Sequence, residues 1–190
     1  MKIQPVFDKE SQLFVWEISD ISLPMDIDNK LSNIEWISYY ANIEENSARR
    51  YIGNDIGIGN YTDTALLEIK NHLVNDIFYE NIHQAWPDDY LKNYDIPKNT
   101  HSIIKDIPNT DMGEHWDNFL IYGVFIFNLK DNPNARTAYY DFKTETLLYE
   151  GPTKKGTGIF HLNSAACLHS GYNKGNEDRI ISMTVLSVKN

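Results

Sequence analysis

The sequence contains a single cysteine, Cys167, among its 190 residues. One thiol excludes an internal disulfide and any zinc or iron–sulfur site that is built from several cysteines. A chain of this size without disulfides is typical of a reducing compartment, so we expect a cytoplasmic protein.

Positive charge is also scarce, since 17 Lys and Arg stand against 27 Asp and Glu and give a formal net charge of −10. A negative chain without a basic run repels phosphate backbones and anionic lipids, so we expect no nucleic-acid partner and no binding to membrane surfaces. No run of 18 apolar residues occurs, and charges interrupt the first ten residues before any stretch of signal-peptide length. We therefore expect a soluble protein.

Hydrophobic residues are present in the amount that a folded core needs, at 42% of the chain, with 13% aromatic residues. The length fits one domain, so we predict a single domain over residues 1–190. Turn residues and β-rich runs predict short strands at 4–7 and 13–18. Apolar residues at helical spacing predict helices at about 31–48 and 63–82, so residues 1–98 should form helical support with flanking strands.

The second half of the chain has a different character. Runs rich in β-branched and aromatic residues, separated by Asn, Asp, Gly, Pro and Lys, predict strands at 100–107, 119–129, 137–142, 146–149, 156–162 and 179–188. Six short strands in about 90 residues suggest a sandwich, barrel or jelly roll, which would form the core over residues 99–190. The predicted fold class is α+β, with the N-terminal helices bracing the outer face of the core.

Four residues in this half could act together. His115 and Asp117 are two positions apart, and in an extended chain such side chains project to the same side. His169 lies further along the chain, and Arg179 opens the last apolar strand. Two imidazoles and one carboxylate on one face of an octahedral ion leave three sites for other ligands, an arrangement that non-haem Fe(II) oxygenases use. A guanidinium suits the far carboxylate of a dicarboxylate that chelates such a metal.

These residues resemble the signature of the Fe(II)/2-oxoglutarate-dependent dioxygenases. Residues 154–163, KKGTGIFHLN, are also similar to the strand that precedes the distal histidine in prolyl 4-hydroxylase-like members. The resemblance covers residues 100–188 and implies a double-stranded β-helix, or jelly roll, with the metal at its open end. It further implies that Fe(II) and 2-oxoglutarate serve as cofactor and cosubstrate. The implied reaction uses molecular oxygen, converts 2-oxoglutarate to succinate and CO2, and oxidises an unactivated C–H bond of a peptide side chain, an amino acid or another small metabolite.

Carried over to this sequence, the resemblance makes His115, Asp117 and His169 the metal ligands and catalytic centre, and Arg179 the partner of the C5 carboxylate of 2-oxoglutarate. The chain departs from the frequent Arg-x-Ser pattern, because Ile181 stands where a helping hydroxyl would be. Tyr122 is our first candidate for a replacement hydroxyl in cosubstrate binding, and Thr137 is the second.

Other interpretations remain open. His161 could be a fourth ligand in a cupin-like metal dioxygenase that does not use 2-oxoglutarate, or a hydrogen-bonded histidine inside a strand. A non-enzymatic jelly-roll binding module is the third alternative, in which the same polar residues form surface turns and cross-strand ion pairs.

Overall fold

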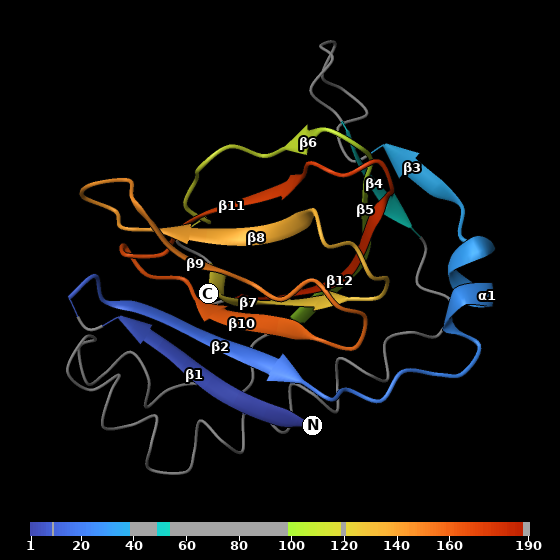
Figure 1. Cartoon of the computed structure of the whole chain (residues 1–190), viewed down its shortest axis with the longest axis horizontal. Helices are drawn as coiled ribbons and strands as arrows, with labels where there is room; N and C mark the ends of the chain where they lie inside the picture. Colours follow the sequence, from blue (N-terminus) through green and yellow to red (C-terminus); the bar gives the residue numbers. More distant parts are fainter. Residues whose placement is uncertain (9, 39–48, 54–98, 119–120, 188–190) are drawn as a thin grey trace.

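Two antiparallel sheets face each other in the computed structural model, which describes residues 1–8, 10–38, 49–53, 99–118 and 121–187 (Figure 1). Eight strands of the second half are divided equally between the sheets: β5 Asn99–Asp106, β6 Thr110–Asp111, β7 Ile121–Asn128, β8 Ala135–Tyr140, β9 Leu147–Glu150, β10 Gly158–Leu162, β11 Leu168–Asn173 and β12 Arg179–Ser187. The larger sheet contains the order β10-β7-β12-β5, and the smaller sheet has the order β6-β11-β8-β9. Four strands in each of two packed sheets make a jelly roll, as the sequence predicted.

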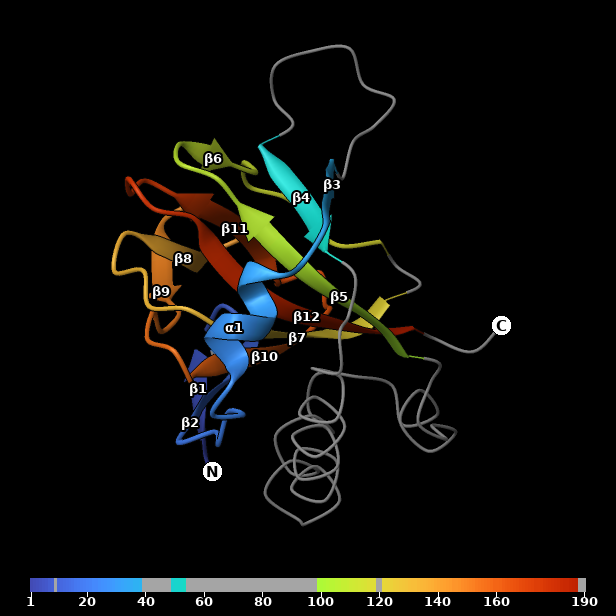
Figure 2. The same ribbon diagram turned by 90° about the vertical axis from the view of Figure 1, so that its right-hand side faces the viewer.

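Strands from the first half of the chain extend the larger sheet at both edges. They are β1 Lys2–Asp8, β2 Leu13–Ser19, β3 Trp36–Ser38 and β4 Arg50–Gly53. β2 pairs with β10, with β1 outside it, while β4 pairs with β5, with β3 outside it. The larger sheet therefore has eight strands, and its N-terminal strands are continuous with the jelly roll (Figure 2).

The prediction of bracing N-terminal helices is not borne out in the part of the chain that is described. That part has one helix, α1 Ile27–Ser32, followed by β3. The helix expected at 31–48 is wrong over residues 33–38, because the helical spacing joined Leu31, in α1, to Ile37, in a strand. The helix expected at 63–82 lies outside the described residues. No described helix is long and apolar enough to span a bilayer.

Alternation along the strands of the larger sheet gives it two buried faces. On β2, Phe14, Trp16 and Ile18 join a cluster that also contains Ile27 and Leu31 of α1, whereas Leu13 and Val15 join the cluster of the opposite face. The second cluster also takes Tyr139 of the smaller sheet, so it fills the space between the sheets. This period of two is what a strand buried on both faces requires.

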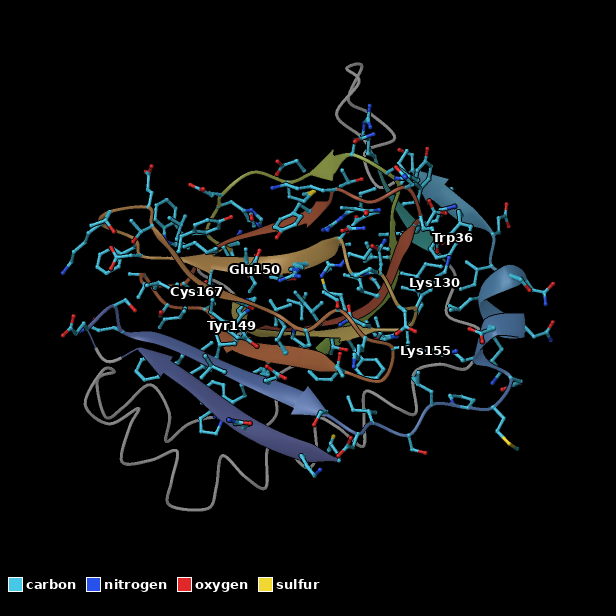
Figure 3. All side chains as sticks on the ribbon, viewed as in Figure 1. Trp36, Lys130, Tyr149, Glu150, Lys155 and Cys167 are labelled. Atoms are coloured by element: carbon cyan, nitrogen blue, oxygen red, sulfur yellow. The ribbon has the colours of Figure 1, made fainter. Side chains whose placement is uncertain are left out.

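Polar contacts connect the layers as well. The hydroxyl of Tyr149, on β9, donates a hydrogen bond to Glu17 of β2 at 2.7 Å (Figure 3). Lys155, which precedes β10, forms an ion pair with Asp28 of α1 at 2.7 Å. The first contact joins the smaller sheet to the larger one, and the second joins α1 to the same jelly roll.

Candidate metal and cosubstrate site

Backbone pairing holds two of the predicted metal ligands side by side. His115 follows β6 and forms an isolated antiparallel bridge with His169 of β11, through N–H to carbonyl distances of 2.8 and 3.0 Å. Their ring centroids are 4.5 Å apart. The pairing of β6 with β11 thus continues to the point where the two imidazoles meet.

Both imidazoles are oriented by backbone carbonyls. Nδ1 of His115 lies 3.0 Å from the carbonyl oxygen of Gly113, and Nδ1 of His169 lies 3.0 Å from that of Cys167. A carbonyl can only accept, so each Nδ1 carries the proton and each Nε2 presents a lone pair. Metal-binding histidines are commonly fixed in this way.

Asp117 completes the group. One ligand atom from each of His115, Asp117 and His169 lies within 4.8 Å of the others, as one ion would require. Burial raises the pKa of the Asp117 carboxyl, but a hydrogen bond from His161 and the neighbouring imidazoles outweigh it, so the pKa lies below its ordinary value. Burial, followed by the effect of His161, lowers the pKa of His169 to about 3. Both groups are thus in the unprotonated form that binds metal.

His161, the residue whose role the sequence left open, lies wholly buried between Asp117 and a tyrosine. Its Nε2 is 3.3 Å from Oδ2 of Asp117, and its Nδ1 is 2.7 Å from the hydroxyl of Tyr139. Burial raises the pKa of Tyr139 well above its ordinary value, so the phenol stays protonated and donates a hydrogen bond to Nδ1 of His161. His161 can then donate from Nε2 to Asp117. Sequence reasoning did not identify Tyr139, because 22 residues separate it from His161.

Cys167 also lies near His161 and His169. Burial raises the pKa of its thiol, and the thiolate is the form that binds metal. The group of His115, Asp117 and His169 is therefore a better metal site than the group that contains Cys167, and its nitrogen and carboxylate donors suit Fe(II).

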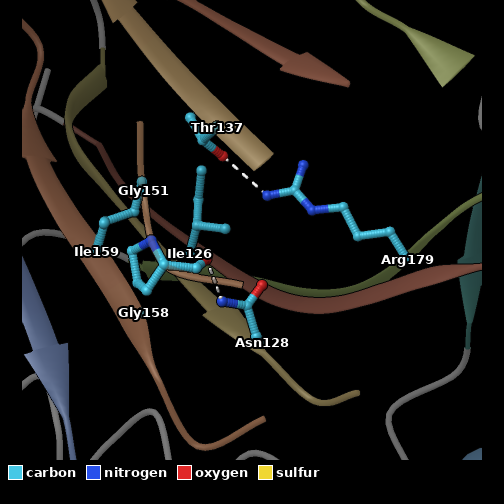
Figure 4. A pocket seen from close by; sticks show the side chains of 8 residues that line it. Ile126, Asn128, Thr137, Gly151, Gly158, Ile159 and Arg179 are labelled. Atoms are coloured by element: carbon cyan, nitrogen blue, oxygen red, sulfur yellow. Dashed lines mark hydrogen bonds between the residues drawn. The ribbon is translucent and has the colours of Figure 1, made fainter. Parts of the chain in front are cut away.

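Arg179 is the second part of the site. It is 3% exposed, and its Nη2 donates a hydrogen bond to the hydroxyl of Thr137 at 2.9 Å (Figure 4). Its Nε has no hydrogen-bond partner among the described residues. Burial lowers the pKa of Arg179 to about 10, against the opposing effect of Asp106, so the guanidinium stays charged at neutral pH.

A small pocket lies beside this guanidinium, lined by Ile126, Asn128, Thr137, Gly151, Pro152, Gly158, Ile159 and Arg179 (Figure 4). Thr137 is two residues from Tyr139 on β8, and Ile159 is two residues from His161 on β10. Residues two apart on a strand share a face, so Thr137 and Ile159 face the same space between the sheets as Tyr139 and His161, and His161 contacts Asp117. Among the described residues, the Nε donor of this buried cation has no partner, and together with the three predicted metal ligands it suits a dicarboxylate that chelates a metal.

The hydroxyl beside Arg179 comes from Thr137, the second of the two candidates. Tyr122 lies in β7, but its side chain is outside the described part of the structure. Ile181 is buried in the apolar cluster between the sheets, consistent with the absence of a helping hydroxyl on β12. Thr137 belongs to the smaller sheet and Arg179 to the larger one, and strand patterns alone do not reveal such a contact.

Trp116 lies between two of the predicted ligands and is 53% exposed. Its indole N–H donates to the carbonyl of Ala165 at 3.0 Å, which connects the loop after β6 to the loop before β11. An exposed aromatic side chain is therefore fixed between two of the predicted metal ligands.

A jelly roll in which two histidines and an aspartate converge, with a buried arginine in the same fold, presents the donor set that non-haem Fe(II) oxygenases use. Comparison with solved structures is more specific: the chain has the fold of the 2-oxoglutarate/Fe(II) oxygenases. A prolyl hydroxylase from Trichoplax adhaerens, solved with a peptide fragment of hypoxia-inducible factor, matches with a TM-score of 0.64 and 12% identity, over 91% of this chain and 83% of that one.

Two further structures show the breadth of the similarity. The viral collagen prolyl hydroxylase of Paramecium bursaria Chlorella virus-1, solved with 2-oxoglutarate, has a TM-score of 0.53 and 16% identity, over 93% of this chain and 96% of that one. The epimerase SnoN from nogalamycin biosynthesis has a TM-score of 0.51 and 11% identity, over 92% of this chain and 78% of that one. No model of a known protein family and no curated protein sequence matches this chain.

Proposed function

We propose that this protein is an Fe(II)- and 2-oxoglutarate-dependent oxygenase that hydroxylates an unactivated C–H bond of a peptide side chain, an amino acid or another small metabolite, with release of succinate and CO2. One observation carries the proposal: His115, Asp117 and His169 converge within 4.8 Å, and the buried Arg179, whose Nε has no hydrogen-bond partner in the described part of the chain, faces the space between the sheets. In this proposal the three convergent residues bind the metal.

The remaining residues position the reactants. Fe(II), when bound, supplies the activation of oxygen that is coupled to oxidative decarboxylation of 2-oxoglutarate. Arg179 and Thr137 bind the C5 carboxylate, so that its charge is paired away from water. Ile126 and Ile159 form an apolar wall of the pocket and limit the entry of water. Trp116 offers a flat apolar surface to a substrate at the mouth of the site.

Anaerobic titration tests the proposal most directly. Fe(II) should bind at one site per chain, and added 2-oxoglutarate should produce the weak visible charge-transfer band of a chelated 2-oxo acid. His169→Ala should abolish tight metal binding, because two remaining protein ligands compete poorly with water. On admission of oxygen, succinate should form in the wild type and not in the His169→Ala protein.

The outcomes separate the alternatives. Iron binding without the band, together with loss of iron in His161→Asn, would support a cupin-like dioxygenase in which His161 is a ligand. Failure of the folded wild-type protein to bind either Fe(II) or Mn(II) would contradict any metal-dependent reaction and leave a non-enzymatic jelly-roll module.

A further inference from the structure

We propose that Arg50 is a positioning residue that keeps Arg179 available for the cosubstrate, by binding a buried carboxylate that would otherwise pair with Arg179 directly. The inference rests on the proposed function, because it assigns a second residue to the same cosubstrate site. The carboxylate is that of Asp106, at the end of β5.

The three side chains form one row across the larger sheet. Asp106 is the direct partner of Arg179 in the pairing of β5 with β12, and of Arg50 in the pairing of β5 with β4. Residues directly opposite each other in antiparallel strands are close enough to interact. Asp106 therefore has a guanidinium on each side.

The contacts to the two arginines are unequal. Arg50 donates from Nε to Oδ1 of Asp106 at 2.7 Å and from Nη2 to Oδ2 at 3.0 Å, which is a bidentate pair. Nη1 of Arg179 is 3.7 Å from the same Oδ2, which is an ion pair but is beyond hydrogen-bond distance. Arg50 therefore satisfies both oxygens, and Arg179 retains only the neutral hydroxyl of Thr137 as a hydrogen-bond partner among the described residues.

The two guanidiniums also approach each other over Gly171. A Cβ at that position would lie 3.4 Å from Nη2 of Arg50 and 3.5 Å from Nη1 of Arg179. A shift of well under 1 Å would bring Arg179 into hydrogen-bond range of Asp106. Asp106 is completely buried, and a buried carboxylate that loses its partner takes another cation.

Removal of the Arg50 guanidinium should therefore transfer Asp106 to Arg179. 2-Oxoglutarate must then break that pair before it binds. Since hydrogen bonds to charged groups contribute about 1.5–3 kcal/mol, the dissociation constant for 2-oxoglutarate in Arg50→Met should rise about 10- to 150-fold. The measurement is titration of anaerobic, Mn(II)-loaded protein with 2-oxoglutarate.

Two matched variants distinguish this effect from general damage. In Arg50→Met/Asp106→Asn no carboxylate competes for Arg179, so affinity should return to within about threefold of wild type. Arg49→Met removes the neighbouring arginine, which donates to the carbonyl of Pro108, and should leave affinity unchanged. Affinity that stays low in the double variant would overturn the inference.

A second test needs no cosubstrate. In wild type, Arg179 has only a long ion pair to an Asp106 carboxylate that Arg50 already binds through both oxygens, so Arg179→Met should lower the urea midpoint of unfolding by a small amount. In the Arg50→Met background the same substitution should lower the midpoint clearly, since it then breaks a buried ion pair. If Arg50→Met does not fold, Arg50→Lys serves instead, because a lysine releases one Asp106 oxygen and should give an intermediate rise in the dissociation constant. Equal shifts in the two backgrounds would contradict the inference.

Arg179→Ala separates the inference from the proposed function. Wild-type affinity for 2-oxoglutarate in Arg179→Ala would show that the cosubstrate site is misassigned. A large loss in Arg179→Ala, together with unchanged affinity in a folded Arg50→Met protein, would overturn the role of Arg50 alone.

Discussion

Each imidazole near Asp117 has its proton placed by a group that is not itself a proposed ligand. Carbonyl oxygens fix His115 and His169, whereas the hydroxyl of Tyr139 fixes His161. A proton on Nε2 of His161 lets that histidine hold Asp117 in position instead of competing with it for the metal. These supporting hydrogen bonds matter because the Asp117 carboxylate would otherwise adopt orientations that do not bind a metal.

Tyr139→Phe tests the hydrogen bond that orients His161. The substitution leaves Nδ1 of His161 without its donor in a fully buried site, and metal affinity should fall about 10- to 100-fold, as is usual for damage around metal ligands. Tyr149→Phe, which removes the bond to Glu17, is the matched control and should keep wild-type affinity. Competition with a chelator measures both, and equal affinity in the two variants would contradict the proposed role of Tyr139.

Thr137→Val tests the hydroxyl beside Arg179. The isosteric substitution removes one neutral partner of the guanidinium, so the dissociation constant for 2-oxoglutarate should rise about 2- to 13-fold while metal affinity is unchanged. Thr184→Val is the control, because Thr184 is equally buried but its hydroxyl contacts His101. Calorimetric titration of both proteins should separate them, and an equal loss in the control would assign the effect to the loss of any buried hydroxyl.

The pKa of His169 predicts how the metal-free protein responds to acid. In the folded protein this pKa is about 3, against an ordinary value of about 6.5, so the unfolded chain binds the extra proton first. The free energy of unfolding should therefore fall as the pH drops from about 7 towards 4. Urea unfolding across this range should give a shallower pH dependence for His169→Gln, and an identical slope would contradict the assignment.

Strands were more predictable from the sequence than helices or cross-sheet contacts. Runs rich in β-branched and aromatic residues, bounded by turn residues, identified β1, β2, β5, β7 and β12, because such side chains pack well on a sheet. The sequence analysis did not predict β11, because Leu168–Asn173 contains Gly and Asn, which are uncommon in strands, besides the polar His and Ser. The candidate ligands came from spacing, whereas Arg50 and Tyr139 reach the site through sheet pairing and layer packing, which leave no local signal.

Two glycines on paired strands control how closely β7 and β10 approach. A Cβ on Gly158 would lie 2.5 Å from the carbonyl oxygen of Ile126, and one on Gly123 would lie 2.7 Å from that of His161. In both cases the obstacle is backbone, which yields less readily than a side chain. Because β7 and β10 lie so close, the side chains of Ile159 and His161 on β10 are held in the space between the sheets.

Gly158→Ala should therefore destabilise the protein by about 1–3 kcal/mol, the usual cost of overpacking, and should weaken 2-oxoglutarate binding because Gly158 lines the pocket. Gly113→Asn is the control, since no atom lies within 4 Å of its Cβ position and Asn tolerates the positive φ of 63°. Chemical denaturation measures both variants. A stable Gly158→Ala protein with normal binding would show that the strands can separate without consequence.

At the scale of the whole molecule, the N-terminal strands complete the jelly roll. β2 covers the edge of β10, the strand that carries His161, and supplies side chains to both apolar clusters. Among the described strands, β1 pairs with β2 alone. The site therefore depends on residues that are more than 140 positions away in the sequence.

Truncation should show that β2 is needed for folding and that β1 is not. A chain that begins at Leu13 keeps β2 and should fold, with a lower melting temperature and a tendency to self-associate through the freed edge. A chain that begins at Pro24 loses five core residues of β2 and should not unfold cooperatively. Circular dichroism melts and size-exclusion chromatography test both, and a cooperative melt of the shorter chain would show that β2 is dispensable.

The place of β12 in the sheet determines the order of events during synthesis. β12 lies between β5 and β7 and pairs with both, although about 70 residues separate the end of β5 from the start of β12. Until β12 has been translated, β5 and β7 have no common neighbour, and their hydrogen-bonding edges remain available to other chains. The nascent polypeptide must therefore wait for one of its last strands, and chaperones that shield open strand edges should increase the yield of soluble protein more than they change its final stability.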